Sequence, residues 1–112
     1  MNDQVKKSLI DILQAAEEIR SFVRGMDFGA YRDSPVTQRA VERNFEIIGE
    51  ALNRISKTDN ELLSQVSEHR RIIGFRNILI HGYDVIDEAI VWNAVEKHLP
   101  ILIRDVTKIL NA

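Results

Sequence analysis

Residues 40–55 read Ala40-Val41-Glu42-Arg43-Asn44-Phe45-Glu46-Ile47-Ile48-Gly49-Glu50-Ala51-Leu52-Asn53-Arg54-Ile55, and this stretch decides the fold class. Its spacing places one apolar stripe along one face of a helix. The stripe comprises Val41, Phe45, Ile48, Leu52 and Ile55. Gly49 interrupts it and costs about 1 kcal/mol relative to alanine inside a helix. We therefore expect another helix to pack closely against Gly49.

The N-terminal side of this stretch predicts how the helix begins and what precedes it. Ser34 is suited to cap the helix, with Pro35 at the first helical position. An earlier helix has the apolar face Val5, Leu9, Ile12, Ala16, Ile19 and Val23, and it should end near Gly25. Residues 25–35, with two glycines and a proline, are expected to form a loop.

The C-terminal side predicts two or three further helices. Thr58 and Glu61 fit a capping box for a short helix over 61–67, and a fourth helix should cover about 70–81. Asp87 can cap a fifth helix, with Pro100 inside it as the expected site of a kink. Its apolar face comprises Val91, Val95, Leu102, Val106 and Ile109. Because no run alternates with period two, the sequence predicts an all-α bundle of four to five helices.

Length and composition limit the classes of function. The 112 residues predict one domain over 1–112, and 45% hydrophobic with 29% charged residues argues against disorder. A net charge of −2 argues against a protein that coats nucleic acid by bulk charge, but it permits a local basic patch. The absence of cysteine excludes disulfides, thiolate zinc sites and a cysteine nucleophile. No secretory or membrane segment is recognisable, so we expect a soluble, cytoplasmic protein.

The fourth predicted helix carries an anomaly. At about 100° per residue, Arg76 falls inside the apolar arc, between Ile72 and Ile80. A core-facing arginine is costly unless its guanidinium meets an anion or a polar cleft. Asn77 and His81 share the opposite flank, and an apolar residue, Ile78, projects near it. An apolar residue on this second side suggests that another subunit covers the helix there.

Arg70 and Arg71 lie at the start of this helix and make the segment the most basic one of an acidic chain, which a phosphate would suit. Taken singly, Arg76 could pair with a carboxylate, His81 could interact with the end of the helix, and Tyr83 could simply pack. The sequence gives little support for another kind of site, because it has no glycine-rich phosphate loop and no His-Glu-x-x-His metal-binding pair. The three histidines are too dispersed for a metal site. The adjacent acids Glu17/Glu18 and Asp87/Glu88 are expected on the solvated surface.

The segment Arg76-Asn77-Ile78-Leu79-Ile80-His81-Gly82-Tyr83 resembles the Arg-x4-His-x-Tyr signature of HEPN domains. The chain is most similar to the HepT-type toxins, formerly the DUF86 group. Residues 40–51 resemble the second-helix pattern of that group. Val91-Trp92 and Leu99-Pro100 also occur where the group has similar features. The likeness spans nearly the whole chain.

The resemblance implies a HEPN-like homodimer that acts as a metal-independent endoribonuclease without a cofactor. It implies that Arg76 and His81 form the catalytic pair and that Asn77 supports them. The partners it implies are RNA, either tRNA or mRNA, and an MNT-type nucleotidyltransferase antitoxin. The resemblance thus implies a type VII-like toxin–antitoxin system in which this chain is the toxin. The antitoxin neutralises it by adding AMP to Tyr83.

The chemistry is reasonable without the family. Histidine, with an ordinary pKa near 6.5, can move protons at neutral pH, and arginine binds phosphate oxygens through its planar fork. We expect a 2′,3′-cyclic phosphate and a free 5′-hydroxyl as products, with Arg70 and Arg71 as further RNA contacts. One alternative is a non-catalytic HEPN module that binds a nucleotide or partner, which the low overall charge favours. Another is a helical dimerisation domain with an accidental signature.

Overall fold

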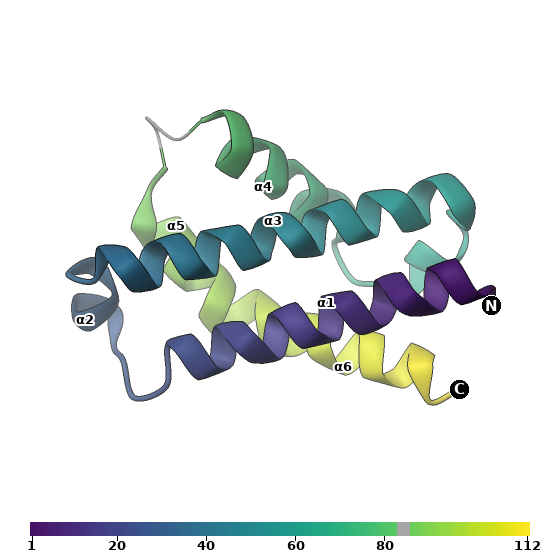
Figure 1. Cartoon of the computed structure of the whole chain (residues 1–112), viewed down its shortest axis with the longest axis horizontal. Helices are drawn as coiled ribbons and strands as arrows, with labels where there is room; N and C mark the ends of the chain where they lie inside the picture. Colours follow the sequence, from purple (N-terminus) through teal and green to yellow (C-terminus); the bar gives the residue numbers. More distant parts are fainter. Residues whose placement is uncertain (83–85) are drawn as a thin grey trace.

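The structure is a computed structural model that describes residues 1–82 and 86–112. Every regular element in those two ranges is helical, which confirms the all-α prediction. Figure 1 shows the two long helices, α1 (Asp3–Phe22) and α3 (Pro35–Thr58), running antiparallel in the centre of the molecule. The signature helix α4 (His69–His81) lies along one side of α3, and the C-terminal helices lie behind α1 and α3 (Figure 1).

Each of the two long helices is capped by a side chain at its N-terminus. The Asn2 side chain accepts a hydrogen bond from the Val5 amide at 2.8 Å and caps α1. Ser34 caps α3, and Pro35 is its first residue, which confirms that prediction. Every residue of the predicted stripe in α3 is buried, as are all but the last of the stripe in α1. Together these two helices supply half of the buried apolar residues of the core.

The segment 25–35 is not only a loop, so that prediction is wrong in part. A short helix, α2 (Phe28–Arg32), begins at Asp27, whose carboxylate accepts a hydrogen bond from the Ala30 amide at 2.8 Å. It places the fully buried Tyr31 ring 5.2 Å from the Trp92 ring. One helical turn is too short to show periodicity, so its signals were limited to an aspartate at the cap position, Asp27, and two aromatic residues, Phe28 and Tyr31.

The capping box predicted after α3 is also wrong. Thr58 still belongs to α3, and its hydroxyl donates to the Arg54 carbonyl at 3.0 Å. Asp59 takes the capping role instead by accepting from the Leu62 amide at 3.2 Å. The helix that follows is a 3₁₀ turn, Leu62–Gln65, and not a helix over 61–67.

Helix α4 confirms the predicted range of 70–81 and packs on α3. The Phe45 and Phe75 rings meet edge to face with centroids 5.4 Å apart. Gly49 lies against Arg76, so the expected close approach at this glycine is confirmed. This approach fixes where α4 crosses α3.

The C-terminal region is one helical path with an irregular middle. Asp87 caps α5 (Glu88–Asn93) as predicted, and α6 (Leu99–Leu110) carries Pro100 in its first turn. Where a proline kink was expected, the structure has a π-helical turn, Ala94–His98, directly before that proline. Such a widened turn absorbs an irregularity in the hydrogen-bond ladder. The predicted apolar face of this path is buried throughout. Of the helices in the described ranges, none combines the length and apolar character needed to cross a membrane.

Candidate functional site

Arg76 leaves the α3–α4 interface with its aliphatic stem pressed against Gly49. A Cβ atom placed on Gly49 would lie 2.3 Å from Cβ of Arg76 and 3.1 Å from its Cδ. The Nη2 atom donates to the Asn77 Oδ1 atom at 2.6 Å, which joins two of the predicted site residues. The Nε atom is buried and has no hydrogen-bond acceptor among the described residues. A buried donor without an acceptor is costly, so Arg76 is prepared to receive an anion.

His81 is the last residue of α4 and is exposed. The Gly82 amide donates to the Ile78 carbonyl at 2.7 Å, and the helix ends there. Asn77 and Ile78 are also exposed, so the outward flank predicted for this helix is present. Tyr83, the predicted site of modification, lies outside the described residues.

Arg76 and His81 lie on different flanks of α4. Five residues of α-helix correspond to about 140° of rotation and about 7.5 Å of rise. A single helix therefore does not point the guanidinium and the imidazole at the same spot. The structure joins Arg76 to Asn77 and leaves His81 on the outer flank.

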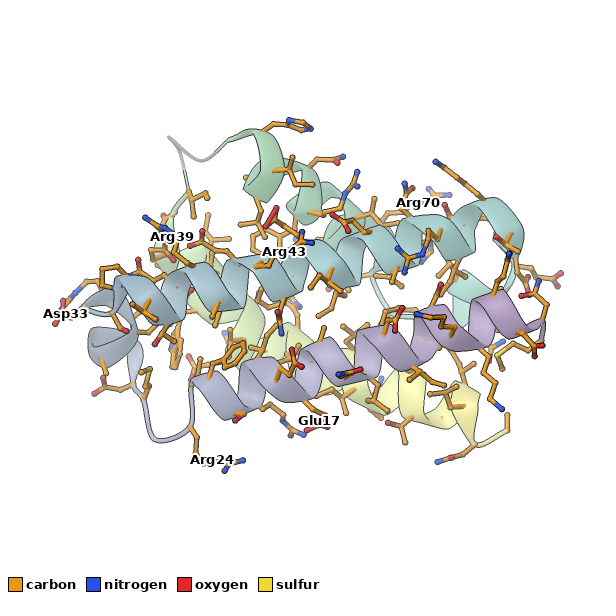
Figure 2. The ribbon with its side chains drawn as sticks, viewed as in Figure 1. Glu17, Arg24, Asp33, Arg39, Arg43 and Arg70 are labelled. Carbon is orange, nitrogen blue, oxygen red and sulfur yellow. The ribbon has the colours of Figure 1, made fainter. Side chains whose placement is uncertain are left out.

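Arg70 and Arg71 lie at the opposite end of α4 from His81. Figure 2 shows Arg70 projecting over the C-terminal half of α3, whereas α4 ends over the N-terminal half. Both arginines are exposed, and Arg71 pairs with Glu68 at 3.2 Å. Eleven residues separate Arg70 from His81, or about 16 Å of helix. Any RNA contact at Arg70 would therefore involve a nucleotide different from the one at His81.

A groove of about 840 Å³ borders α4 and was not recognisable in the sequence. Three exposed isoleucines line it: Ile78 (53% exposed), Ile90 (58%) and Ile101 (38%). Its basic lining residues are Arg71, Lys97, His98 and Arg104, and its acidic one is Glu68. Ile78 was recognised in the sequence as an apolar residue on the second side of its helix, whereas Ile90 and Ile101 gave only the weaker signal of lying outside the predicted core stripe.

A buried acidic pair lies between α3 and α5, where sequence reasoning placed nothing. Burial, followed by the neighbouring Glu88, raises the pKa of Glu42 to about 7. The Tyr31 hydroxyl is close to both acids, and its burial first and Glu88 second raise the pKa of that phenol. The prediction of a solvated pair at Asp87/Glu88 holds for Asp87, but Glu88 is half-buried with one oxygen fully enclosed. Only the fold brings Glu42 and Glu88 together.

Within the two described ranges, no three histidine, aspartate or glutamate side chains converge as metal ligands would. The predicted site residues in α4 are Arg76, Asn77 and His81, which carry a guanidinium, an amide and an imidazole. This set can bind an anion and transfer a proton.

Comparison with known proteins identifies the family. The profile described as ribonuclease HepT-like matches residues 12–109, which include all of α4. The chain belongs to the ribonuclease HepT-like family. The resemblance found in the sequence is thereby confirmed, and the helical HEPN fold of this family agrees with the observed bundle.

Relatives of similar length support this membership. A "Putative RNase" of Methanocaldococcus jannaschii is 34% identical over 102 residues, covering 91% of this chain and 93% of the relative. A "Putative RNase" of Caldanaerobacter subterraneus subsp. tengcongensis is 37% identical over 99 residues, or 88% of each chain. A "Probable ribonuclease HepT" of Thermococcus cleftensis is 35% identical over 97 residues, or 87% of each chain. No solved structure matches this HepT-like chain.

Proposed function

We propose that this protein is a metal-independent endoribonuclease, the toxin of a HEPN/MNT toxin–antitoxin system, which cleaves cytoplasmic tRNA or mRNA. The observation that carries the proposal is the state of Arg76. Its buried Nε donor has no acceptor among the residues that the structure describes, while Asn77 holds the far end of the guanidinium. A phosphate oxygen is the acceptor that this arrangement lacks.

Arg76 binds the scissile phosphate in this mechanism. Asn77 occupies Nη2, and the remaining N–H groups of the guanidinium can bond phosphate oxygens. The fixed positive charge stabilises the negative charge that grows on the phosphorane-like transition state. Because the stem is packed on Gly49, the guanidinium is already oriented before RNA binds.

His81 takes the proton from the ribose 2′-hydroxyl, whose oxygen then attacks the adjacent phosphorus. The 5′-oxygen leaves and takes up a proton, so the products are a 2′,3′-cyclic phosphate and a 5′-hydroxyl. The exposure of His81 allows RNA to reach it. Each chain supplies one such histidine, and a second copy supplies the other, so that one acts as base and one as acid.

A homodimer also accounts for the groove beside α4. Its three exposed isoleucines come from three different helices and share one surface with the signature helix. A second copy placed there covers this apolar surface and brings two α4 helices together. The dimer thus resolves the separation of Arg76 from His81 on a single helix, because the partner's imidazole can face the guanidinium.

Cleavage of purified RNA in the presence of EDTA tests the proposed activity. We expect wild-type protein to cleave, and His81→Ala to lose about 10²-fold or more of the rate with an unchanged melting temperature. His69→Ala is the matched control, since it removes a histidine from the same helix at the opposite end. Full activity of His81→Ala would refute the assignment. Absence of cleavage by the wild type would favour the non-catalytic nucleotide- or partner-binding module.

Neutralisation by AMPylation of Tyr83 completes the proposal. The chain has two tyrosines, and Tyr31 is fully buried, so a modifying enzyme cannot reach it in the folded protein. Tyr83 follows His81 by two residues. AMP attached there would add a phosphodiester that can occupy Arg76 and an adenosine that blocks RNA.

Co-expression with the MNT-type nucleotidyltransferase antitoxin tests the modification. We expect the mass of the toxin to rise by one or more AMP units. Tyr83→Phe should abolish the increase and restore toxicity while remaining an active nuclease in vitro. An AMP mapped to another residue, or a non-toxic complex without any mass increase, would refute this mechanism.

A further inference from the structure

The crossing of α3 and α4 depends on the missing side chain of Gly49. The three atoms nearest to a Cβ placed on this glycine are Cβ, Cγ and Cδ of Arg76, at 2.3, 2.9 and 3.1 Å. No other residue comes that close. Gly49 thus forms a notch in α3 that is occupied by the stem of one side chain, the arginine assigned to the phosphate.

We infer that Gly49 is the positioning residue for Arg76, setting the depth of α4 against α3 and so the place where the guanidinium emerges. The inference rests on the proposed function for its catalytic meaning. Its geometric part stands on the α3–α4 packing alone. A glycine at this point of a long helix otherwise lowers helix stability, so the close approach supplies the reason for its presence.

A methyl group at position 49 cannot be accommodated by rotating the arginine side chain. The nearest atom, Cβ of Arg76, is bonded to the backbone and moves only if α4 moves. Helix α4 must therefore shift away or rotate, carrying Arg76 with it. The Nε atom would leave its enclosed place, and the pairing with Asn77 would change. A displacement of about 1 Å at a phosphate-binding group can cost about 10²-fold in rate.

The signature helix contains a matched control. Gly74 lies two residues before Arg76 in α4, and a Cβ placed there meets nothing within 4 Å. Gly74→Ala is therefore the same chemical change on the arginine's own helix without the clash. It should raise the melting temperature slightly because alanine favours helix.

The experiment compares Gly49→Ala, Gly74→Ala and wild type in RNA cleavage, thermal unfolding and the NMR signal of the Arg76 Nε–H group. We expect Gly49→Ala to lose about 10²-fold in cleavage and to shift or broaden that signal. Gly74→Ala should leave that NMR signal in place, because the added methyl group does not touch Arg76. The NMR readout is independent of catalysis, so an inactive wild type would refute the proposed function and leave this inference to be decided by the signal.

A double-mutant cycle decides the case in which Gly49→Ala folds poorly. Arg76→Gly removes the stem that the new methyl group would strike. We expect Gly49→Ala to lower the melting temperature in the wild-type background and not in the Arg76→Gly background. Equal losses in both backgrounds would overturn the inference. A folded Gly49→Ala protein with wild-type cleavage and an unmoved Arg76 signal would overturn it too.

Discussion

The α1–α3 pair and the signature helix α4 differ in how their ends are capped and in how many residues they bury. Helices α1 and α3 are each capped by a side chain and bury seven and ten residues, respectively. Helix α4 begins at Glu68, which has a left-handed φ of 55°, has no side-chain cap and buries Leu79 alone. Its first turn carries His69, Arg70 and Arg71 at the positive end of the helix dipole, where cations are unfavourable.

This difference separates the scaffold from the site. Where propensity, capping and burial agree, the segment serves stability, and departures from them concentrate at functional sites. Helix α4 retains a half-buried arginine, an exposed isoleucine and an uncapped basic start, none of which stabilises an isolated chain. The same features suit a surface that receives a phosphate and a second subunit.

The largest effect should come from the core side of the comparison. Ile48 is fully buried in α3, so Ile48→Ala should reduce the free energy of unfolding by about 2–5 kcal/mol, which chemical denaturation measures.

A change on the exposed side of α4 should affect assembly and not folding. Ile78 is 53% exposed, so Ile78→Asp should keep the helical circular dichroism but convert the proposed dimer to a monomer in sedimentation. A dimeric Ile78→Asp protein would contradict the role assigned to the groove.

The next effect concerns Glu42, the buried acid of α3 that lies beside Glu88 of α5. The folded protein holds the Glu42 proton up to about pH 7, whereas an ordinary glutamate loses it near 4.5. Between these values the unfolded chain binds fewer protons than the folded one, so the free energy of unfolding falls as the pH rises. Urea unfolding at pH 5 and pH 8 measures it. Glu42→Gln should remove most of the slope, and the exposed Glu17→Gln should not.

Removing a cap should have a smaller effect on the scaffold. The Ser34 side chain accepts from the Thr37 amide at 3.4 Å. Ser34→Ala should lower the free energy of unfolding by about 1 kcal/mol without changing RNA cleavage. Chemical denaturation measures the first and the cleavage assay the second. A loss of cleavage with intact stability would mean that the scaffold and the site are not separated as described.

The smallest effect should be a gain at the start of α4. Glycine adopts the left-handed conformation of Glu68 without strain, so Glu68→Gly should stabilise the protein by about 0.5–1 kcal/mol. The exposed ion pairs of Glu68 with Arg71 and His98 offset little of this gain. A clear destabilisation would show that these pairs fix the beginning of the helix.

Periodicity and caps predicted the long elements because these signals are local. The stripe of α3, the Ser34 cap and the range of α4 follow from neighbours within a few residues. The α2 turn, the 3₁₀ turn and the pairing of Glu42 with Glu88 depend on partners distant in the chain, and no spacing encodes them.

The same distinction between local signals and contacts of distant residues applies to the candidate site. Arg76 was predicted because it falls inside the apolar arc of its helix, and Asn77 and His81 were predicted from the resemblance to the Arg-x4-His-x-Tyr signature. The groove as a whole was not recognisable, because it joins residues of α4, α5 and α6 that are distant in the sequence.

Mapping the ends of the cleaved RNA tests most directly the claim that side chains of α4 perform the cleavage. Purified protein would be incubated with RNA and EDTA, beside Arg76→Ala and His81→Ala, and both ends of each new fragment analysed. The account predicts a 2′,3′-cyclic phosphate and a 5′-hydroxyl at each cut, in the wild type only. Fragments with a 3′-hydroxyl and a 5′-phosphate, or cleavage that stops in EDTA, would contradict it.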